Sequence, residues 1–404
     1  MLGSLAAMPS PTARRTTVGI VGGGPAGLML GHLLHVAGID SVTVDIRTRH
    51  EIETTVRAGI LERDSVRLLV DSGVSGRVLQ DGDEHRGIEL GFGGGSHHID
   101  FQDLVSASVW LYPQTSVFTD LADARARDGA EVYFGVVGTE VVDIASDAPG
   151  IRFTDADGVL REVRCDYLVG ADGSRSLCRQ QMPAANRTHL FREYPFAWFG
   201  ILCEAPKSAP ELIYSQSDRG FALISQRSET VQRMYFQCDP EEDVSAWSDD
   251  RIWSELQSRV GANGFVLKEG PVFEKTVLRF RSFVNEPMQH GRLLLAGDAA
   301  HTVPPTGAKG LNLALADVRV LAELMERAVA QRDPSALDDY TSRALERVWK
   351  AQHFSYWMTT MLHRLPDMTD FDVRRQAAEL RSLVTSRAGA TFLAEGYTGW
   401  PSAG

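Results

Sequence analysis

Three glycines near the start of the chain have the types and spacing that most clearly suit ligand binding. They are Gly22, Gly24 and Gly27, spaced as Gly-x-Gly-x-x-Gly. A turn of this kind lets the backbone approach a pyrophosphate, and the helix that follows offers unpaired N–H groups to the phosphates. Asp45 comes 21 residues after Gly24, where a carboxylate can accept a hydrogen bond from an adenosine ribose hydroxyl. These four residues predict a dinucleotide-binding site.

Two later turns place carboxylates directly after short apolar runs. Asp172, in the pair Asp172-Gly173, follows one such run, and Asp298, in the pair Gly297-Asp298, follows another. In open α/β sheets, ligands bind at the carboxyl ends of the strands, so both side chains are expected at that edge. The loop 304–310 is rich in glycine and proline and leads into a helix whose N-terminus can stabilise negative charge on a ligand.

The elements that must position these residues begin with a strand, a helix and a second strand. We expect strands at Thr17–Val21 and Ser41–Ile46, joined by an amphipathic helix that stops at Gly38. Further along, helical periodicity is expected around Thr119–Asp128, Leu311–Ala330 and Pro334–Leu365, and strands at His85–Phe101, Val132–Ile144 and Ile151–Val169. Alternating runs between 196 and 285 predict an antiparallel sheet.

Composition excludes several classes of protein. The chain has 404 residues, 43% of them hydrophobic, which is typical of a globular protein of two or three domains. The net charge of −12 argues against a nucleic-acid or anionic-membrane partner. The four cysteines form no CxxC pair and are expected to be reduced, no apolar run is long enough to cross a membrane, and we expect a cytoplasmic protein that binds no metal.

The three motifs together resemble those of the FAD-dependent aromatic hydroxylases, the single-component flavoprotein monooxygenases. The resemblance spans about 17–401 and is most specific for the members that act on 4-hydroxybenzoate. The stretches that carry it are RAGILE (57–62), ELIY (211–214), RGFALISQRS (219–228), RSFVNEPMQHGR (281–292) and GDAAHTVPPTGAKGLNLA (297–314).

The resemblance implies a reaction cycle in which NADH or NADPH reduces FAD and the reduced flavin traps O2 as a hydroperoxide. That species delivers one oxygen atom to C3 of 4-hydroxybenzoate, giving 3,4-dihydroxybenzoate. Such chemistry belongs to the cofactor, while the protein supplies binding, orientation and electrostatics. A small aromatic acid and O2 are thus the implied partners, and a homodimer is implied as well.

The resemblance also assigns roles to residues at the cofactor. In addition to Gly22, Gly24, Gly27 and Asp45 at the adenosine end, it implies three groups of FAD contacts. These are Arg57 and Gln114 at the pyrophosphate and ribitol, Asp172 and Asp298 in the later turns, and the backbone of Gly310, Leu311 and Asn312 beside the isoalloxazine.

For the substrate, the resemblance implies a carboxylate site and a proton relay. Arg227 would grip the carboxylate with its planar fork, aided by Ser225 and Tyr235. Tyr214 would hydrogen-bond the substrate phenol, beside the carbonyl of Pro305. The relay would then run through Tyr397 to His85 and solvent, because a phenol with a pKa of about 10 must lose its proton before the ring is most reactive.

The coenzyme side departs from the family pattern. NADPH-using members carry a basic, an aromatic and a second basic residue where this chain has Ile46, Glu51 and Thr55. A 2′-phosphate favours arginine or lysine, and Glu51 would repel it, so we predict that the enzyme accepts NADH, and does so in preference. The resemblance places three arginines near the coenzyme: Arg175, Arg179 and Arg281.

The expected fold is α/β, with mixed α+β character. A Rossmann-like FAD-binding domain (15–84, 104–187 and 285–345) is interleaved with an antiparallel β-sheet substrate domain (85–103 and 188–284), and a C-terminal helical region covers 346–404.

Alternatives remain open at this point. The same machinery could act on 3-hydroxybenzoate or an aminobenzoate, whereas a dehydrogenase or a flavin-binding sensor leaves several motifs unexplained. His97 and His98 are expected at a surface turn, since neighbouring strand residues point to opposite faces. One stripe at helical spacing is expected to form a core face or a dimer contact rather than a ligand channel: Trp349, His353, Trp357, Met361 and Leu365.

Overall fold

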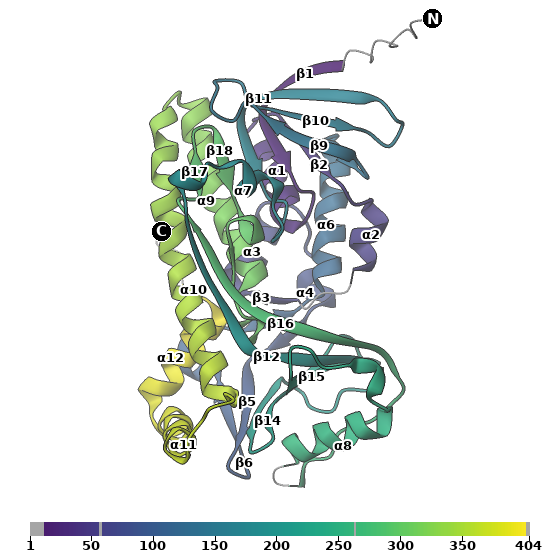
Figure 1. Ribbon diagram of the computed structural model, residues 1–404, viewed down its shortest axis with the longest axis vertical. Coiled ribbons are helices and arrows are strands. Elements are labelled where there is room, and N and C mark those ends of the chain that lie inside the picture. Colours follow the sequence, from purple (N-terminus) through teal and green to yellow (C-terminus); the bar gives the residue numbers. More distant parts are fainter. Residues whose placement is uncertain (1–11, 56–58, 262–263, 401–404) are drawn as a thin grey trace, which may run out of the picture.

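Three β-sheets organise the residues described by the computed structural model, which are 12–55, 59–261 and 264–400 (Figure 1). We call them the parallel sheet, the second sheet and the small sheet. The parallel sheet lies at one end of an elongated molecule and the second sheet at the other. Two long strands of the second sheet, β12 (Thr188–Glu204) and β16 (Val272–Glu286), run between the two ends.

The parallel sheet contains the glycine turn. Its central strand is flanked on both sides by parallel neighbours, so the strands that carry the predicted motifs all end at the same edge. Its spatial order is β17 (Gln289–His290), β18 (Leu293–Leu295), β11 (Leu160–Gly170), β1 (Thr12–Val21), β2 (Ser41–Asp45) and β8 (Glu131–Phe134), with β10 (Gly150–Thr154) and β9 (Val137–Val142) continuing from β11.

Three long helices bury the apolar residues of this sheet. The helix α1 (Pro25–Val36) contacts both α6 (Gln114–Arg127) and α9 (Gly310–Ala330). Leu28 and Leu34 of α1 are fully buried in the same cluster as the strand residues. The apolar spacing that predicts this helix is therefore the face that packs against its neighbours.

The second sheet carries the predicted substrate residues. Its order is β19 (His301–Thr302), β16, β12, β15 (Val231–Cys238), β14 (Gly220–Gln226), β13 (Ile213–Ser217), β5 (Gly87–Phe92) and β6 (Gly95–Asp100). The pairs are antiparallel, as predicted, except that β13 and β5 run parallel.

The small sheet joins the two ends of the molecule. It consists of β3 (Ile60–Glu62), β7 (Val109–Leu111) and β4 (Asp83–His85), with β7 in the centre. Both outer strands are antiparallel to β7. His85 on β4 is paired with Val109 on β7, so it belongs to the small sheet, which joins the parallel sheet to the second sheet.

The C-terminal part is helical. The helix α10 (Tyr340–Leu362) runs along one side of both ends of the molecule, and α11 (Asp370–Thr385) and α12 (Arg387–Thr398) pack beside its lower half (Figure 1). The remaining helices are α2 (Arg49–Thr54), α3 (Arg63–Asp71), α4 (Val78–Asp81), α5 (Phe101–Val105), α7 (Leu177–Gln181) and α8 (Asp249–Val260).

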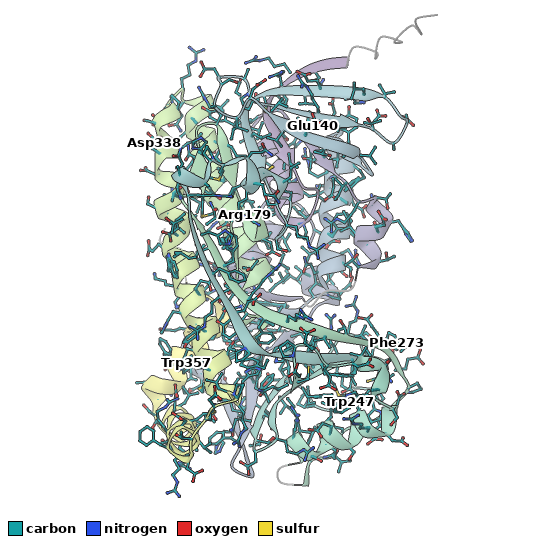
Figure 2. All side chains as sticks on the ribbon, in the orientation of Figure 1. Glu140, Arg179, Trp247, Phe273, Asp338 and Trp357 are labelled. Atoms are coloured by element: carbon teal, nitrogen blue, oxygen red, sulfur yellow. The ribbon has the colours of Figure 1, made fainter. Side chains whose placement is uncertain are left out.

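Some predicted elements differ from those observed. The first strand begins five residues before the predicted Thr17, and α6 begins at Gln114 rather than Thr119. The helix α8 lies in a region predicted to contain only strands. Ser248 caps its first turn, and Trp253 and Leu256 bury its apolar face, so tertiary packing and a local cap outweigh the strand pattern there. Figure 2 shows the neighbouring Trp247 beneath the second sheet.

The buried apolar side chains form clusters that can be set beside the predicted domain division. One cluster draws on residues between 18 and 78, between 112 and 182, and between 288 and 344. Two other clusters draw on residues of the second sheet and of the C-terminal helices. The predicted boundary at 345/346 falls inside α10, which continues from one part to the next. We retain the three-part division as a proposal.

Several sequence features have structural roles. His97 and His98 lie on β6 of a hairpin: His97 stacks on Phe92, and Nε2 of His98 lies 2.8 Å from Glu211 Oε2. The predicted stripe on α10 is neither wholly buried nor wholly exposed, since Met361 is buried while Trp349 is 45% exposed. The indole N–H groups of Trp349 and Trp357 donate to Glu286 and Glu379, and Figure 2 shows Trp357 on α10.

All four cysteines are free, and burial raises the pKa of Cys165 to about 12. Within 12–55, 59–261 and 264–400 we find no helix of the length and apolar character that a bilayer requires. The same described residues hold no group of three or more histidine, cysteine, aspartate or glutamate side chains placed to bind a metal ion.

Candidate active site

The glycine turn after β1 is packed on one side and open on the other. A Cβ at Gly27 would lie 1.8 Å from the carbonyl oxygen of Gly22, and a Cβ at Gly22 would lie 2.2 Å from that of Ala171. At Gly24, by contrast, the nearest atom to a Cβ would be Arg47 Nη2 at 3.9 Å. The turn therefore needs its first and third glycines for packing and leaves the second facing open space.

The start of α1 completes an anion cradle at this open side. Gly24 is the N-cap residue and Pro25 the first helical residue, and no side chain caps the helix. The first turn carries no acidic residue, so its N–H groups and the positive end of the helix dipole face the turn unopposed. These features fit the pyrophosphate of FAD, and Gly22, Gly24 and Gly27 are the residues that would hold it.

Asp45, at the end of β2, is buried and already engaged. Its carboxylate accepts a hydrogen bond from the backbone N–H of Gly23 at 2.8 Å. It also accepts three from Arg47, one from the backbone and two from the guanidinium. These four donors occupy the carboxylate, and a ribose hydroxyl bound there would compete with the Arg47 guanidinium. No sequence motif pointed to Arg47, although its spacing of two residues from Asp45 offers a signal.

Asp172 and Arg179 hold the second turn together. The Asp172 carboxylate accepts from the Ser176 hydroxyl at 2.5 Å and from the N–H of Cys178 at 3.1 Å. Arg179 is nearly buried, and its guanidinium donates to the carbonyls of Ala299 and Ser174, both at 2.7 Å. Arg179 therefore ties this turn to the turn after β18 (Figure 2).

Arg175 and Arg281, the other two arginines predicted near the coenzyme, are both exposed. Ile46 is 69% exposed, and Thr55 is exposed as well. The Glu51 carboxylate accepts from the backbone N–H and the hydroxyl of Thr48, which forms a capping box at the start of α2. Glu51 therefore has a structural role besides the predicted effect on the coenzyme. All of these coenzyme assignments stay predictions.

Asp317 of α9 holds the turn after β18 in place. The N–H of Gly297 donates to Asp317 Oδ2 at 2.8 Å, and Nε2 of His301 lies 2.6 Å from the same oxygen. Asp298 is partly exposed on this turn, at the carboxyl edge of the parallel sheet. Burial alone would lower the pKa of His301, but the charge and hydrogen bond of Asp317, together with the charge of Asp298, raise the pKa above its ordinary value.

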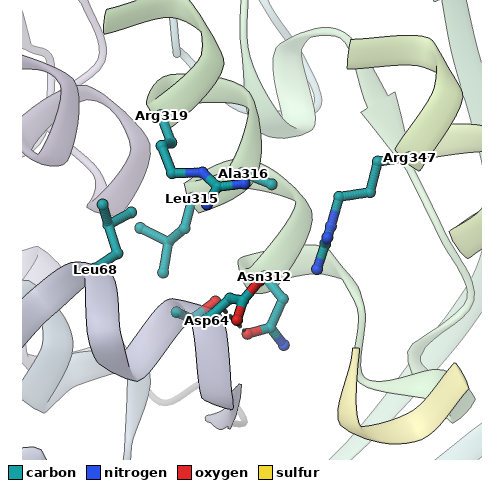
Figure 3. Close-up of a pocket in the computed structure, with 8 residues that line it drawn as sticks. Asp64, Leu68, Asn312, Leu315, Ala316, Arg319 and Arg347 are labelled. Atoms are coloured by element: carbon teal, nitrogen blue, oxygen red, sulfur yellow. Dashed lines mark hydrogen bonds between the residues drawn. The ribbon is translucent and has the colours of Figure 1, made fainter. Parts of the chain in front are cut away.

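The first turn of α9 is held against the small sheet by Asn312. Its amide nitrogen donates to the carbonyls of Ile60 and Ala308, and its oxygen accepts from the N–H of Glu62 and the hydroxyl of Ser65. Figure 3 shows Asn312 with Arg347, which reaches toward it from α10.

The backbone around this turn is accessible to a flat ring. A Cβ at Gly310 would meet no atom within 4 Å, so that side of the helix start is open, and Leu311 follows it on α9. Gln114, the first residue of α6, is partly exposed. Arg57, predicted at the pyrophosphate, lies outside the described residues.

A buried ion cluster lies under the same turn. Lys309 is 2% exposed and donates to Glu62 Oε1 at 2.6 Å and to the carbonyl of Tyr397 at 2.9 Å. Arg347 donates to Glu62 Oε2 and to the carbonyl of Trp400. The cluster fastens the C-terminal segment around Tyr397 to α9 and the small sheet. No sequence motif pointed to Glu62, Lys309 and Arg347 as a group.

On the second sheet, the predicted substrate residues share one face. Tyr214 is paired with Leu223, and Leu223 with Tyr235, while Ser225 and Arg227 follow Leu223 at intervals of two. Tyr235 lies over Gly200 of β12, where a Cβ would come within 2.8 Å of its ring. The hydroxyl of Ser225 donates to the carbonyl of Arg233. The sheet therefore brings Tyr214, Ser225, Arg227 and Tyr235 together.

Two arginines on this face have unused capacity for an anion. Arg227 is half-buried, and its guanidinium reaches the Thr115 hydroxyl, at 3.5 Å, in the first turn of α6. Burial, followed by the neighbouring charge of Arg233, lowers the pKa of Arg227. Nη1 of Arg233 is buried without a hydrogen-bond partner among the described residues. An orphaned N–H donor beside a second guanidinium fits a carboxylate ligand.

The two predicted relay tyrosines meet in the core. The hydroxyls of Tyr214 and Tyr397 lie 2.8 Å apart, and both residues are 1% exposed. The Tyr214 hydroxyl also lies 3.4 Å from the carbonyl of Thr306. The carbonyl of Pro305 accepts from the N–H of Ala308, so in this geometry the carbonyl within reach of Tyr214 is that of the next residue.

Among the described residues, His85 makes no hydrogen bond with Tyr214 or Tyr397. It is fully buried, and among the described residues its hydrogen-bonding neighbours are Asp83 and Gln226 rather than Tyr397. Gln226 lies between Ser225 and Arg227 on β14, so His85 adjoins the same sheet. Burial lowers the pKa of His85, although the charge of Asp83 opposes this effect.

Comparison with known proteins identifies the family to which this chain belongs. The family model described as an FAD binding domain matches residues 15–355. The chain is 42% identical over 389 residues to p-hydroxybenzoate hydroxylase of Acinetobacter baylyi, covering 96% of each chain. It is 28% identical to a 3-(3-hydroxy-phenyl)propionate/3-hydroxycinnamic acid hydroxylase of Burkholderia vietnamiensis, covering 83% of this chain and 61% of the other.

Solved structures show the same fold. The crystal structure of p-nitrophenol 4-monooxygenase from Pseudomonas putida superposes with a TM-score of 0.76 at 18% identity, covering 96% of this chain and 100% of that one. The family match covers most of the chain, and the relative at 42% identity covers nearly all of it. The chain therefore belongs to the family of FAD-dependent aromatic hydroxylases.

Proposed function

We propose that the substrate is 4-hydroxybenzoate and that the product is 3,4-dihydroxybenzoate. The observation that carries this proposal is an anion site on the second sheet together with a buried pair of hydroxyls, one from that sheet and one from α12. Arg227 and Arg233 supply the charge for a carboxylate, and Tyr214 and Tyr397 supply the hydroxyls, 2.8 Å apart. The name of the relative at 42% identity supports the same choice.

Bound FAD, once reduced by a nicotinamide coenzyme, supplies the activation of O2 and the transfer of one oxygen atom to the ring. The residues that would hold it are the glycine turn, Asp45, Asp172, Asp298 and the first turn of α9. The open cradle at Gly24 and the open face at Gly310 support this placement, because both leave the backbone accessible to a flat or charged group. Gln114 lies at the helix start that also meets Arg227.

The protein's own contribution is to orient the ring and to remove a proton from it. Arg227 fixes the carboxylate end with Tyr235, and with Ser225 once its hydroxyl turns away from the Arg233 carbonyl, so that the phenol end points toward Tyr214. The Tyr214 hydroxyl takes the phenol proton as it passes its own proton to Tyr397. Burial raises the pKa of both tyrosines, so each stays protonated at neutral pH and moves protons by accepting one and donating another.

The proton then leaves through His85, whose imidazole can accept it at one nitrogen and release it at the other. The result is a phenolate, whose ring is more electron-rich and more readily attacked by an electrophilic oxygen. The protein surrounds this step with buried side chains, which exclude bulk water from the reacting ring.

Three further features belong to the proposal. NADH would be preferred over NADPH, because Ile46 and Thr55 offer no positive charge for a 2′-phosphate and Glu51 adds a negative one. A homodimer is implied by the resemblance and a cytoplasmic location is expected from the sequence, and both stay predictions.

The decisive experiment uses the purified, FAD-containing enzyme. NADH and O2 consumption are measured with and without 4-hydroxybenzoate, and the product is identified by mass spectrometry. We expect 3,4-dihydroxybenzoate in proportion to the NADH consumed. The comparison compounds 3-hydroxybenzoate and 4-aminobenzoate are expected to give little product. Faster turnover of either one, or coenzyme oxidation without hydroxylated product, would identify a different substrate.

A further inference from the structure

His85 presents its two ring nitrogens to different surroundings. Nε2 lies 2.9 Å from the amide nitrogen of Gln226 and 3.3 Å from Asp83 Oδ2. Nδ1 is buried and has no hydrogen-bond partner among the described residues. A neutral imidazole carries one proton, so it can donate from Nε2 to Asp83, or it can hold the proton on Nδ1 and accept from Gln226. One nitrogen thus faces the interior, and the other faces a carboxylate.

Asp83 connects this imidazole to the surface. It lies two residues before His85 on β4, so both side chains are on the same face of the strand. The His85 side chain is 0% exposed, whereas that of Asp83 is 36% exposed. Between buried imidazole and solvent, the structure therefore places one partly exposed carboxylate in direct contact with Nε2.

Lys207 holds the carboxylate in this position. Its ammonium group lies 2.8 Å from Asp83 Oδ2 and 2.8 Å from the exposed Glu229. Gln226 Nε2 also approaches Asp83 Oδ2, at 3.3 Å. Two donors from different elements therefore direct one oxygen of Asp83 toward His85, and the pair Asp83–Lys207 pins the segment after β12 to the small sheet.

We propose that Asp83 is the outlet of the proton relay: it receives the proton that His85 releases from Nε2 and passes it to solvent. The inference rests on the proposed function, whose relay ends at His85. The step is a pure proton transfer, in which the substrate phenol becomes a phenolate and one proton reaches bulk water without any redox change. Asp83 is a positioning residue, since it acts through His85 and touches neither substrate nor cofactor.

The charges around His85 make Asp83 important to the transfer. Burial lowers the pKa of His85 and so disfavours the protonated imidazole that must form. The groups that face it are Asp83 and Glu211, whose charges raise its pKa, and Lys207, whose charge lowers it. Burial also acts on Asp83, but the hydrogen bond from Lys207 and the charge of His85 outweigh it and lower the pKa of Asp83. Asp83 therefore stays ionised and ready to accept.

The test measures proton release rather than turnover. The oxidised, FAD-containing enzyme is mixed with 4-hydroxybenzoate in a stopped-flow instrument without any reductant. Phenolate formation is followed by its ultraviolet absorbance, and the released proton by a pH indicator. In Asp83→Asn we expect the rate constant of release to fall about tenfold. Asp83→Glu, which keeps the carboxylate, is expected to recover most of that rate.

A second measurement is the pH at which the release rate is half-maximal. This midpoint is expected to shift in opposite directions in two variants. His85 must be neutral to accept a proton, so the midpoint follows its pKa. Loss of the negative charge in Asp83→Asn is expected to move the midpoint to lower pH, and loss of the positive charge in Lys207→Gln is expected to move it to higher pH. A purely structural ion pair would give no such opposite shifts.

A matched control is available at a remote ion pair. Asp249 lies 2.9 Å from Lys275, whose exposure of 25% equals that of Lys207. Asp249→Asn should leave release at the wild-type rate. Equal rates in Asp83→Asn and Asp249→Asn, while Tyr214→Phe still abolishes hydroxylation, would overturn this inference and leave the proposed function standing. If the wild-type enzyme hydroxylates its substrate without ionising the phenol, the relay and this inference both fail.

Discussion

The phenol oxygens of Tyr214 and Tyr397 lie 2.8 Å apart, although 183 positions separate the two residues in the chain. One comes from β13 of the second sheet and the other from the last helix. Both are buried, and each hydroxyl can accept one proton while donating another. The relay that we propose depends on this contact more than on any other in the molecule.

Replacing Tyr214 with phenylalanine removes one link of the chain and leaves the ring in place. We expect FAD and 4-hydroxybenzoate to bind almost as in the wild type, while product formation falls by about 100-fold, because the phenol can no longer pass its proton on. The measurement is product yield per coenzyme oxidised. Tyr194→Phe removes another buried hydroxyl, bonded to Ser282, and should have little effect. Wild-type yields from Tyr214→Phe would refute the relay.

Arg227→Gln tests the carboxylate site. Loss of the guanidinium leaves the substrate carboxylate with Arg233 alone, and we expect the dissociation constant of 4-hydroxybenzoate to rise by about 10- to 100-fold. Titration of the flavin absorbance measures this constant. A phenol without a carboxylate should bind equally to both proteins. Arg219→Gln, which disrupts an exposed pair with Glu255 near the same sheet, is the matched control. Unchanged affinity in Arg227→Gln would place the carboxylate elsewhere.

Gly24→Ala tests the cradle for the pyrophosphate. A Cβ at this position meets no protein atom closer than 3.9 Å, so the apoprotein should fold with a nearly unchanged melting temperature. The added methyl group projects toward the phosphates, and we expect FAD affinity to fall by about 10- to 100-fold. Gly76→Ala, where a Cβ also meets open space, is the control for glycine replacement itself. Equal FAD affinity in both variants would contradict the assignment.

The coenzyme preference can be examined at Glu51 without unfolding its helix. Glutamine preserves the capping box with Thr48 and removes the negative charge. We therefore expect Glu51→Gln to raise kcat/KM for NADPH by about two- to fivefold and to leave that for NADH unchanged. Steady-state rates with both coenzymes measure this ratio. A wild-type enzyme that strongly prefers NADPH would show the prediction to be wrong.

The pair His301–Asp317 predicts a pH dependence of stability. The folded state raises the pKa of His301 above its ordinary value of 6.5, because Asp317 and the charge of Asp298 together outweigh the effect of burial. The pair therefore stabilises fully below that value, and the contribution is lost as pH rises through the folded pKa. The melting temperature of the wild type should exceed that of His301→Gln most at pH 6 and less at pH 9. A difference in melting temperature that stays constant with pH would contradict the linkage.

Much of the flavin side could be predicted from the sequence, because it depends on local motifs. A glycine turn after an apolar run, and an acidic residue at a fixed distance, fix where Gly24 and Asp45 lie in a parallel sheet. The motifs could not show that Arg47 donates to the Asp45 carboxylate, because this contact depends on side-chain conformation at the end of a strand.

The substrate side depended on resemblance, and its supporting residues were harder to predict. Lys309, Glu62 and Arg347 come from three distant segments, and only the tertiary fold brings their charges together. Asp83 stands near His85 in the sequence, but its contact with Lys207 required the structure. The helix α8 was missed for a similar reason, since its stability comes from packing against the second sheet.

The groups proposed to bind the cofactor and those proposed to bind the substrate lie on different sheets, and this separation has a consequence for how such a protein could change. Groups that would hold the redox cofactor lie on the edge of the parallel sheet, while the groups that would choose the aromatic ring lie on β13, β14 and β15. Substitutions on those three strands can alter which ring is accepted without disturbing the machinery that activates oxygen. The arrangement leaves the oxidant constant and the target free to diversify.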